Sequence, residues 1–129
     1  MAYSDKVLQY FFDPAHAGEM ENPDGSGPVG DPTCGDVLIM FIRVADNCIA
    51  EISYQVCGCP AAVAACEAVA EMVTGKNLEE AEALSDEAVA EYLGGLPEIK
   101  FHCSNVAAEA LHRAIADYRV RKSATPDSR

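Results

Sequence analysis

The chain has 129 residues, half of them hydrophobic, and a formal net charge of −12. This length suits one domain with a hydrophobic core of its own. The negative charge argues against nucleic acid as a partner, because phosphates would be repelled by most of the surface, and no apolar run is long enough to span a membrane. The first residues show no signal-peptide pattern, so we expect a cytoplasmic protein.

The first third of the chain is expected to be mostly irregular. Ser4 can cap a short helix that runs to about Phe12. Residues 14–35 contain four of the seven prolines and five of the nine glycines, which predicts a long functional loop with a turn cluster at residues 22–27. A short edge strand near Pro28–Asp31 is compatible with this composition.

A hairpin is predicted next. The apolar run Val37–Val44 is typical of a central strand, and Ala45–Asn47 is typical of a tight turn. From Cys48 onward the side chains alternate between two faces, which predicts an antiparallel partner strand with one buried face. The residues expected on the buried face are Cys48, Ala50, Ile52, Tyr54 and Val56.

Helices follow the hairpin. Pro60 suits the first position of a helix that Gly75 ends, and its apolar face would hold Val63, Cys66, Ala70 and Val73. Asn77 and Ser85 each have the spacing of a helix cap, and the second of these helices would point Val89, Tyr92 and Leu93 inward.

A last helix is expected from about Ser104 to Lys122, after an extended connector at residues 96–100. Its apolar face would consist of Ala107, Leu111, Ala114, Ile115 and Tyr118. The predicted fold class is therefore α+β, with a small antiparallel β-sheet of about three strands packed against helices. The domain would occupy residues 1–122, and residues 123–129 would form a disordered tail.

Six cysteines in a chain without a secretory signal indicate metal or redox chemistry rather than a disulfide framework. Cys34, Cys59 and Cys103 lie at the boundaries of predicted elements, beside small residues that let the backbone approach a ligand. Cys59 precedes the helix that Pro60 opens, where the helix dipole favours a thiolate. We expect these three cysteines to converge on one metal or cluster site.

Two neighbours are candidates for a fourth ligand. Asp36 and His102 would each complete a Cys₃ set suited to zinc or to iron, and an ordinary structural role remains the alternative for both. Cys48 and Cys66 are expected to be core thiols. His16 and His112 have no such neighbours and are expected to be surface residues.

Cys57 has no single interpretation. It lies on the polar face of its predicted strand, two positions before Cys59. A strained Cys57–Cys59 disulfide, an additional thiolate ligand and no role at all remain open.

Three ordered motifs carry a family likeness. They are Cys34-Gly35-Asp36-Val37, Gly58-Cys59 before the Ala-rich helix, and Tyr92-Leu93-Gly94-Gly95-Leu96-Pro97 with His102-Cys103-Ser104. With the opening Met1–Val7 and Asp13-Pro14, the sequence resembles IscU and the N-terminal domain of NifU, in register from Tyr3 to Tyr118. These families are iron–sulfur cluster assembly scaffolds.

The resemblance implies a mechanism without enzymatic turnover. A cysteine desulfurase would supply sulfur, iron would enter, and a labile cluster, most often [2Fe-2S], would form on three thiolates and a fourth ligand before passing to apo-proteins. It implies that Cys103 receives sulfur, that Asp36 tunes the lability of the cluster, and that His102 can serve as a ligand. It also implies a docking site for a DnaK-type chaperone at Leu96–Lys100.

Some residues depart from the family pattern. Cys57 replaces a usual aromatic residue, and Pro60-Ala61 replaces Gly-Ser. Glu98 replaces the second proline of the chaperone motif, which weakens the expectation of chaperone binding.

Two alternatives remain open. One is a zinc-bound sulfurtransfer partner of a desulfurase, against which the absence of the SufU-type insertion counts. The other is a thiol redox protein using Cys57 and Cys59, which would not need Cys34 and Cys103. A homodimer that shares one cluster is also compatible with the sequence.

Overall fold

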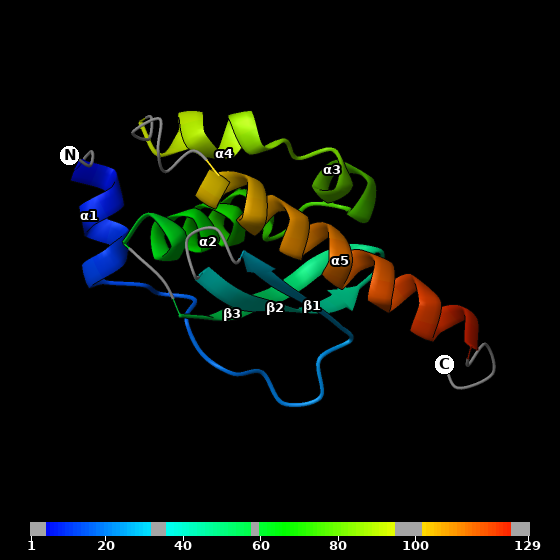
Figure 1. The fold of residues 1–129 in the computed structure, drawn as a ribbon. Helices are drawn as coiled ribbons and strands as arrows, with labels where there is room; N and C mark the ends of the chain where they lie inside the picture. Colours follow the sequence, from blue (N-terminus) through cyan, green and yellow to red (C-terminus); the bar gives the residue numbers. More distant parts are fainter. Residues whose placement is uncertain (1–4, 32–35, 58–59, 95–101, 125–129) are drawn as a thin grey trace.

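The structure is a computed structural model that describes residues 5–31, 36–57, 60–94 and 102–124, with the backbone alone at residues 31, 36, 102–104 and 123–124 (Figure 1). Within these ranges the strands are β1 (Gly25–Asp31), β2 (Asp36–Ala45) and β3 (Cys48–Cys57). They form one antiparallel sheet in the order β1-β2-β3. The helices are α1 (Asp5–Phe12), α2 (Pro60–Val73), α3 (Leu78–Glu82), α4 (Asp86–Tyr92) and α5 (His102–Ala124).

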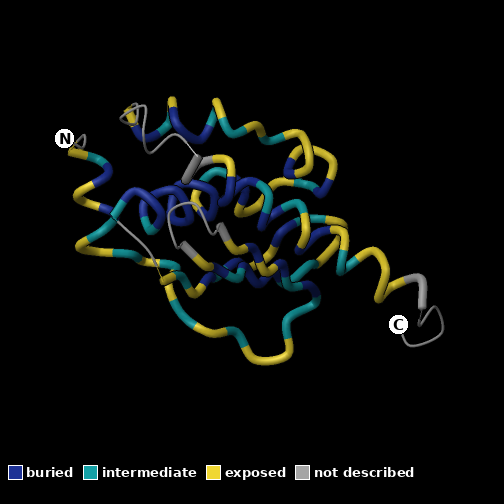
Figure 2. The backbone as a smooth tube through the Cα atoms, viewed as in Figure 1, coloured by how far each residue is buried: buried dark blue, intermediate teal, exposed yellow. Residues whose placement is uncertain are grey.

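Helices α2 and α5 cover one face of the sheet, α1 packs against α2, and α3 and α4 pack along α5 (Figure 1). The buried residues gather between this helical layer and the sheet (Figure 2). The arrangement confirms the predicted α+β class and its three-stranded antiparallel sheet. No helix among the described residues is both long enough and apolar enough to cross a membrane.

Strand β1 occupies part of the predicted loop. It pairs with β2 from Gly25↔Ile42 to Asp31↔Asp36, so the prediction of a turn through Gly27 was wrong. The physical reason is the close approach of α5. A Cβ atom on Gly25 would lie 2.3 Å from the carbonyl oxygen of Ala114, so a larger residue would push the helix off the strand.

The hairpin between β2 and β3 is confirmed, and its turn uses the left-handed conformation at Asp46 (φ 53°) and Asn47 (φ 61°). Two consecutive residues with positive φ suit the twist of a two-residue hairpin. The predicted alternation holds for Ile52 and Tyr54, which are buried.

The alternation fails at the start of β3. Arg43 pairs with Glu51 while Val44 pairs with Ile49, so Ala50 is the extra residue of a bulge. As a result Ile49 is buried and Ala50 is exposed. Cys48 is only half-buried, so the prediction that Cys48 and Ala50 belong to the core was wrong.

The helix boundaries follow the predicted caps closely. Pro60 is the first residue of α2. Asn77 forms a complete capping box with Glu80, and the side chain of Ser85 accepts a hydrogen bond from the backbone N–H of Ala88. The predicted cap at Ser4 and the connector at residues 96–100 lie outside the described residues.

Helix α5 begins at His102 and ends at Ala124, two residues beyond the predicted range at each end. Cys103 therefore lies in its first turn rather than before it. The predicted apolar face of this helix is buried, except that Tyr118 is half-buried. The division into a domain and a tail stays a prediction.

Both edges of the sheet make hydrogen bonds to other parts of the chain. On β1, the backbone N–H of Ser26 donates to Asp117 (2.9 Å), and the carbonyl oxygen of Pro28 accepts from Arg113 (2.9 Å). On β3, the carbonyl oxygen of Tyr54 accepts a hydrogen bond from the backbone N–H of Gly18 (2.8 Å). These contacts occupy edge groups that would otherwise be free to pair with another strand.

Candidate functional site

The described segments that adjoin the predicted ligands meet at one end of the sheet. The last residue of β1 pairs with the first residue of β2, and Cys57 at the end of β3 pairs with Val37. The first turns of α2 and α5 lie on the same side (Figure 1). The fold thus brings together the chain positions beside Cys34, Cys59 and Cys103, as the hypothesis of a shared site requires.

The ligand set itself stays a prediction. Cys34 and Cys59 lie outside the described residues, and so do the side chains of Asp36, His102 and Cys103. Elsewhere, among the side chains that the structure describes, no group of three or more His, Cys, Asp or Glu residues could hold a metal ion.

The three described cysteines differ in their exposure. Cys66 is fully buried in α2, which confirms it as a core thiol. Cys48 is half-buried. Cys57 is exposed and unpaired on the outer face of the sheet, the face away from α2 and α5, as the alternation of β3 predicts.

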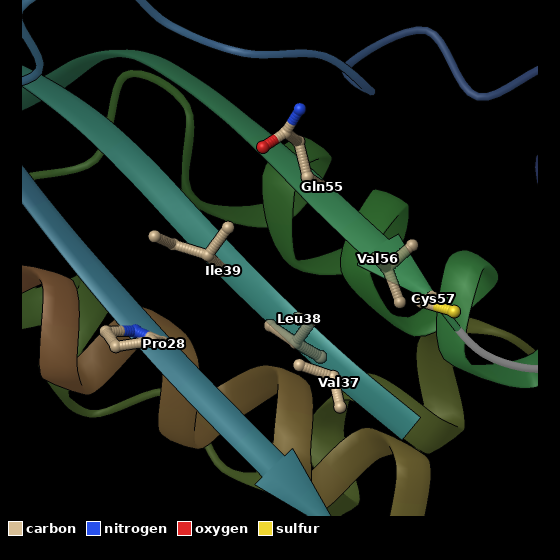
Figure 3. A pocket seen from close by; sticks show the side chains of 7 residues that line it. All are labelled: Pro28, Val37, Leu38, Ile39, Gln55, Val56 and Cys57. Carbon is tan, nitrogen blue, oxygen red and sulfur yellow. The ribbon is translucent and has the colours of Figure 1, made fainter. Parts of the chain in front are cut away.

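Cys57 lines a shallow apolar depression of about 330 Å³ on this outer face (Figure 3). The depression spans all three strands, and its lining consists of Pro28, Val37, Leu38, Ile39, Gln55, Val56 and Cys57. Val37 is 57% exposed, although it is apolar. The end of the sheet beside the predicted ligands therefore presents uncharged, largely apolar surface, which the strand pattern of the sequence did not single out.

A buried carboxylate lies deeper in the fold. Glu67 of α2 is completely buried, and its Oε1 accepts hydrogen bonds from the hydroxyl of Tyr54 (2.8 Å) and the backbone N–H of His16 (2.9 Å). Its Oε2 lies 2.5 Å from Nδ1 of His16. Burial and the hydrogen bond to Glu67 raise the pKa of Tyr54 far above its usual value.

The sequence pattern did not predict this cluster, and the expectation that His16 is a surface residue was wrong, because His16 is half-buried against Glu67. The available signal was Glu67, an acidic residue flanked on both sides by the apolar residues of α2, since a buried carboxylate needs partners. His112 is also half-buried rather than exposed, with a buried Nε2 atom.

One turn further along α2, Glu71 joins three elements. Its Oε1 accepts hydrogen bonds from the hydroxyl groups of Tyr10 in α1 and of Tyr92 in α4 (2.8 Å for Tyr92). The ammonium group of Lys6 lies 3.7 Å from the centre of the Tyr92 ring. The hydrogen bond from Tyr10 lowers the pKa of Glu71, against burial, which raises it.

Comparison with known families agrees with this fold and these motifs. The family described as "NifU-like N terminal domain" matches residues 2–125, nearly the whole chain. The chain belongs to this family. The NifU-like chain is 52% identical over 116 residues to the iron-sulfur cluster assembly scaffold protein IscU 1 of Archaeoglobus fulgidus. The matched region covers 90% of this chain and 76% of that protein.

Other relatives extend the comparison. IscU of Escherichia coli is 43% identical over 128 residues, covering 96% of this NifU-like chain and 99% of that protein. The nitrogen fixation protein NifU of Trichormus azollae is 41% identical, but the match covers only 44% of that longer protein. The crystal structure of a NifU-like N-terminal protein from Brucella abortus superposes with a TM-score of 0.77 at 15% identity, covering 92% of this chain and 94% of that one, which supports the fold alone.

Proposed function

We propose that this protein is a scaffold on which iron–sulfur clusters are assembled. The proposal depends on one observation above all: the fold brings the positions beside three separated cysteines to one end of the sheet. The relatives that match nearly the whole chain carry the name of iron-sulfur cluster assembly scaffold proteins, which supports the same conclusion.

In this proposal Cys34, Cys59 and Cys103 bind the cluster as thiolates. Asp36 or His102 supplies the fourth ligand, and a weak fourth ligand lets the cluster leave. A [2Fe-2S] cluster suits a set of four ligands from one chain. The cluster is cargo, so the protein acts as an acceptor and donor rather than as a turnover enzyme.

Sulfur transfer begins at Cys103. Its thiolate attacks the outer sulfur of a persulfide on a cysteine desulfurase, the S–S bond of the donor breaks, and the desulfurase leaves as a thiolate. Conversion of each transferred sulfur to sulfide takes two electrons, which an external electron-donor protein supplies. The thiolates of Cys34, Cys59 and Cys103 would hold the incoming iron, which would combine with sulfide to form the cluster.

The proposal includes partners and a compartment. The donor is a cysteine desulfurase, and the recipients are apo iron–sulfur proteins in the cytoplasm, where thiols stay reduced. Leu96–Lys100 is the segment for a DnaK-type chaperone, with weakened affinity because of Glu98. A homodimer would let two such sites share a cluster.

Anaerobic reconstitution with iron, cysteine, a desulfurase and a thiol reductant as the electron source, followed by visible absorption and Mössbauer spectroscopy, tests this function. We expect cluster formation to fail after Cys→Ala changes at Cys34, Cys59 or Cys103 and to survive such changes at Cys48 and Cys66. Circular dichroism of each variant controls for folding. A colourless wild-type protein with one tight zinc that iron does not replace would instead favour a zinc-bound sulfurtransfer partner.

A further inference from the structure

The N-terminal strap, defined here as residues 5–18, is hydrogen-bonded to two carboxylates of α2 that lie one helical turn apart. Glu71 holds α1 through the hydroxyl of Tyr10. Glu67 holds the end of the strap through the backbone N–H and Nδ1 of His16. The two fastenings resemble each other chemically, but only Glu67 also bonds to the sheet.

The additional bond of Glu67 reaches β3. Tyr54 is fully buried, and its hydroxyl donates to the same carboxylate oxygen that accepts from the backbone of His16. Tyr54 and Glu67 stand on the two elements that flank residues 58–59, since β3 ends at Cys57 and α2 begins at Pro60. Their hydrogen bond therefore ties β3 to α2 across the junction that contains the predicted ligand Cys59.

The electrostatics make the three partners interdependent. A carboxylate with no solvent exposure depends on its hydrogen-bond donors, and removal of one partner leaves a buried charge incompletely compensated. The side chain of Glu67 is 1% exposed, whereas that of His16 is 30% exposed. The imidazole thus lies between the buried charge and solvent, at the point where the strap ends.

We propose that Glu67 is a positioning residue that couples closure of the strap to the packing of α2 against β3, the two elements that flank the predicted ligand Cys59 in the sequence. When His16 moves away from Glu67, the Glu67 carboxylate binds water or shifts toward Tyr54. The first half of α2 then packs less tightly against β3. This inference extends the proposed function, because the junction contains a predicted ligand. By reciprocity, metal binding at the junction would favour the closed strap.

Cys66 provides a reporter of the junction. It is fully buried and directly precedes Glu67 in α2. Its alkylation under native conditions, measured by peptide mass spectrometry, reports how often this part of α2 opens.

The test compares two changes within the strap. We expect His16→Ala to speed alkylation of Cys66 about tenfold or more, because the buried charge loses a partner. Both rates are corrected for the change in the global unfolding equilibrium that urea denaturation measures. Tyr10→Phe, which removes a bond to Glu71 in the same strap, should then leave alkylation of Cys66 within about twofold. In a Glu67→Gln background, the neutral amide no longer needs the imidazole, so His16→Ala should have a much smaller effect.

Equal acceleration by His16→Ala and Tyr10→Phe would overturn the coupling, as would an unchanged effect of His16→Ala in the Glu67→Gln background. A second measurement uses zinc as the probe. His16→Ala should weaken zinc binding several-fold, while Tyr10→Phe should not, and equal zinc affinities would contradict the coupling to the site. If wild-type protein binds no zinc or cluster, the proposed function fails, whereas the alkylation result still decides whether Glu67 couples strap and junction.

Discussion

Gly27 lies so close to Ala110 that a Cβ atom on the glycine would be 2.2 Å from the alanine carbonyl oxygen. This contact fixes the distance between β1 and α5, the helix whose first turn contains Cys103. The clash would involve helix backbone, which cannot move aside as the end of a flexible side chain can.

Gly27→Ala should therefore destabilise the fold by about 3 kcal/mol, the upper range for overpacking. Urea denaturation measures the loss. Gly30→Ala is the matched control in the same strand, because its nearest neighbour would be Val37 at 4.0 Å and its cost should be below about 1 kcal/mol. Equal effects of the two changes would contradict the close packing of α5 on β1.

The hydrogen bond from Tyr10 to Glu71 should make stability depend on pH. The pKa of Glu71 is lowered in the folded protein, chiefly by this bond. A lowered pKa stabilises the fold above the unfolded value, about 4.3 for glutamate, and the contribution is lost as the pH falls through the folded pKa.

We expect Tyr10→Phe to reduce the free energy of unfolding by about 1 kcal/mol at pH 7 and by less at pH 3. Urea titrations of both proteins at the two pH values measure the difference. A difference that stays constant with pH would show that the loss comes from packing rather than from the carboxylate.

The described thiols should react in the order of their exposure. Cys57 is exposed, Cys48 is half-buried and Cys66 is fully buried. Timed alkylation with iodoacetamide and peptide mass spectrometry should find Cys57 modified first and Cys66 last. In guanidinium chloride the three rates should become similar, and a native rate for Cys66 equal to that for Cys57 would disprove the placement of α2.

The capping box at Asn77, which lies beside Cys48 at the start of β3, should contribute to stability. Its side chain accepts a hydrogen bond from the backbone N–H of Glu80 at 2.8 Å. Asn77→Ala should lower the free energy of unfolding by about 1 kcal/mol, measured by thermal denaturation, while Asn77→Asp should preserve most of it. If Asn77→Ala left the free energy of unfolding unchanged, the cap would not stabilise α3.

Local signals in the sequence identified most of the elements. The apolar run of β2, the alternation of β3 and the cap residues Asn77 and Ser85 are each sufficient to predict an element. The start of β1 was misjudged because glycines and a proline usually mark turns, whereas here the glycines allow a helix to approach the strand. That reason depends on a helix about 85 residues later in the chain, so no local pattern contains it.

The bulge and the buried carboxylate escaped prediction for related reasons. A single inserted residue, Ala50, reverses which side chains of the first part of β3 face the core, and no residue type in the sequence signals this bulge. Glu67 is buried because Tyr54 and His16 converge on it from distant positions. For the candidate site, the placement of Cys34, Cys59 and Cys103 at element boundaries predicted that they converge on one site, and this stays a prediction because the ligands lie outside the described residues.

The hydrogen bonds at the sheet edges bear on how copies of the protein behave in concentrated solution. Asp117 and Arg113 occupy edge groups of β1, and residues 16–18 run beside β3. A neighbouring molecule therefore meets edge groups that are already occupied at these positions, which interrupts the stacking of a further strand, the first step of fibril-like aggregation. These interruptions favour assembly of copies through side-chain surfaces over a continuous shared sheet.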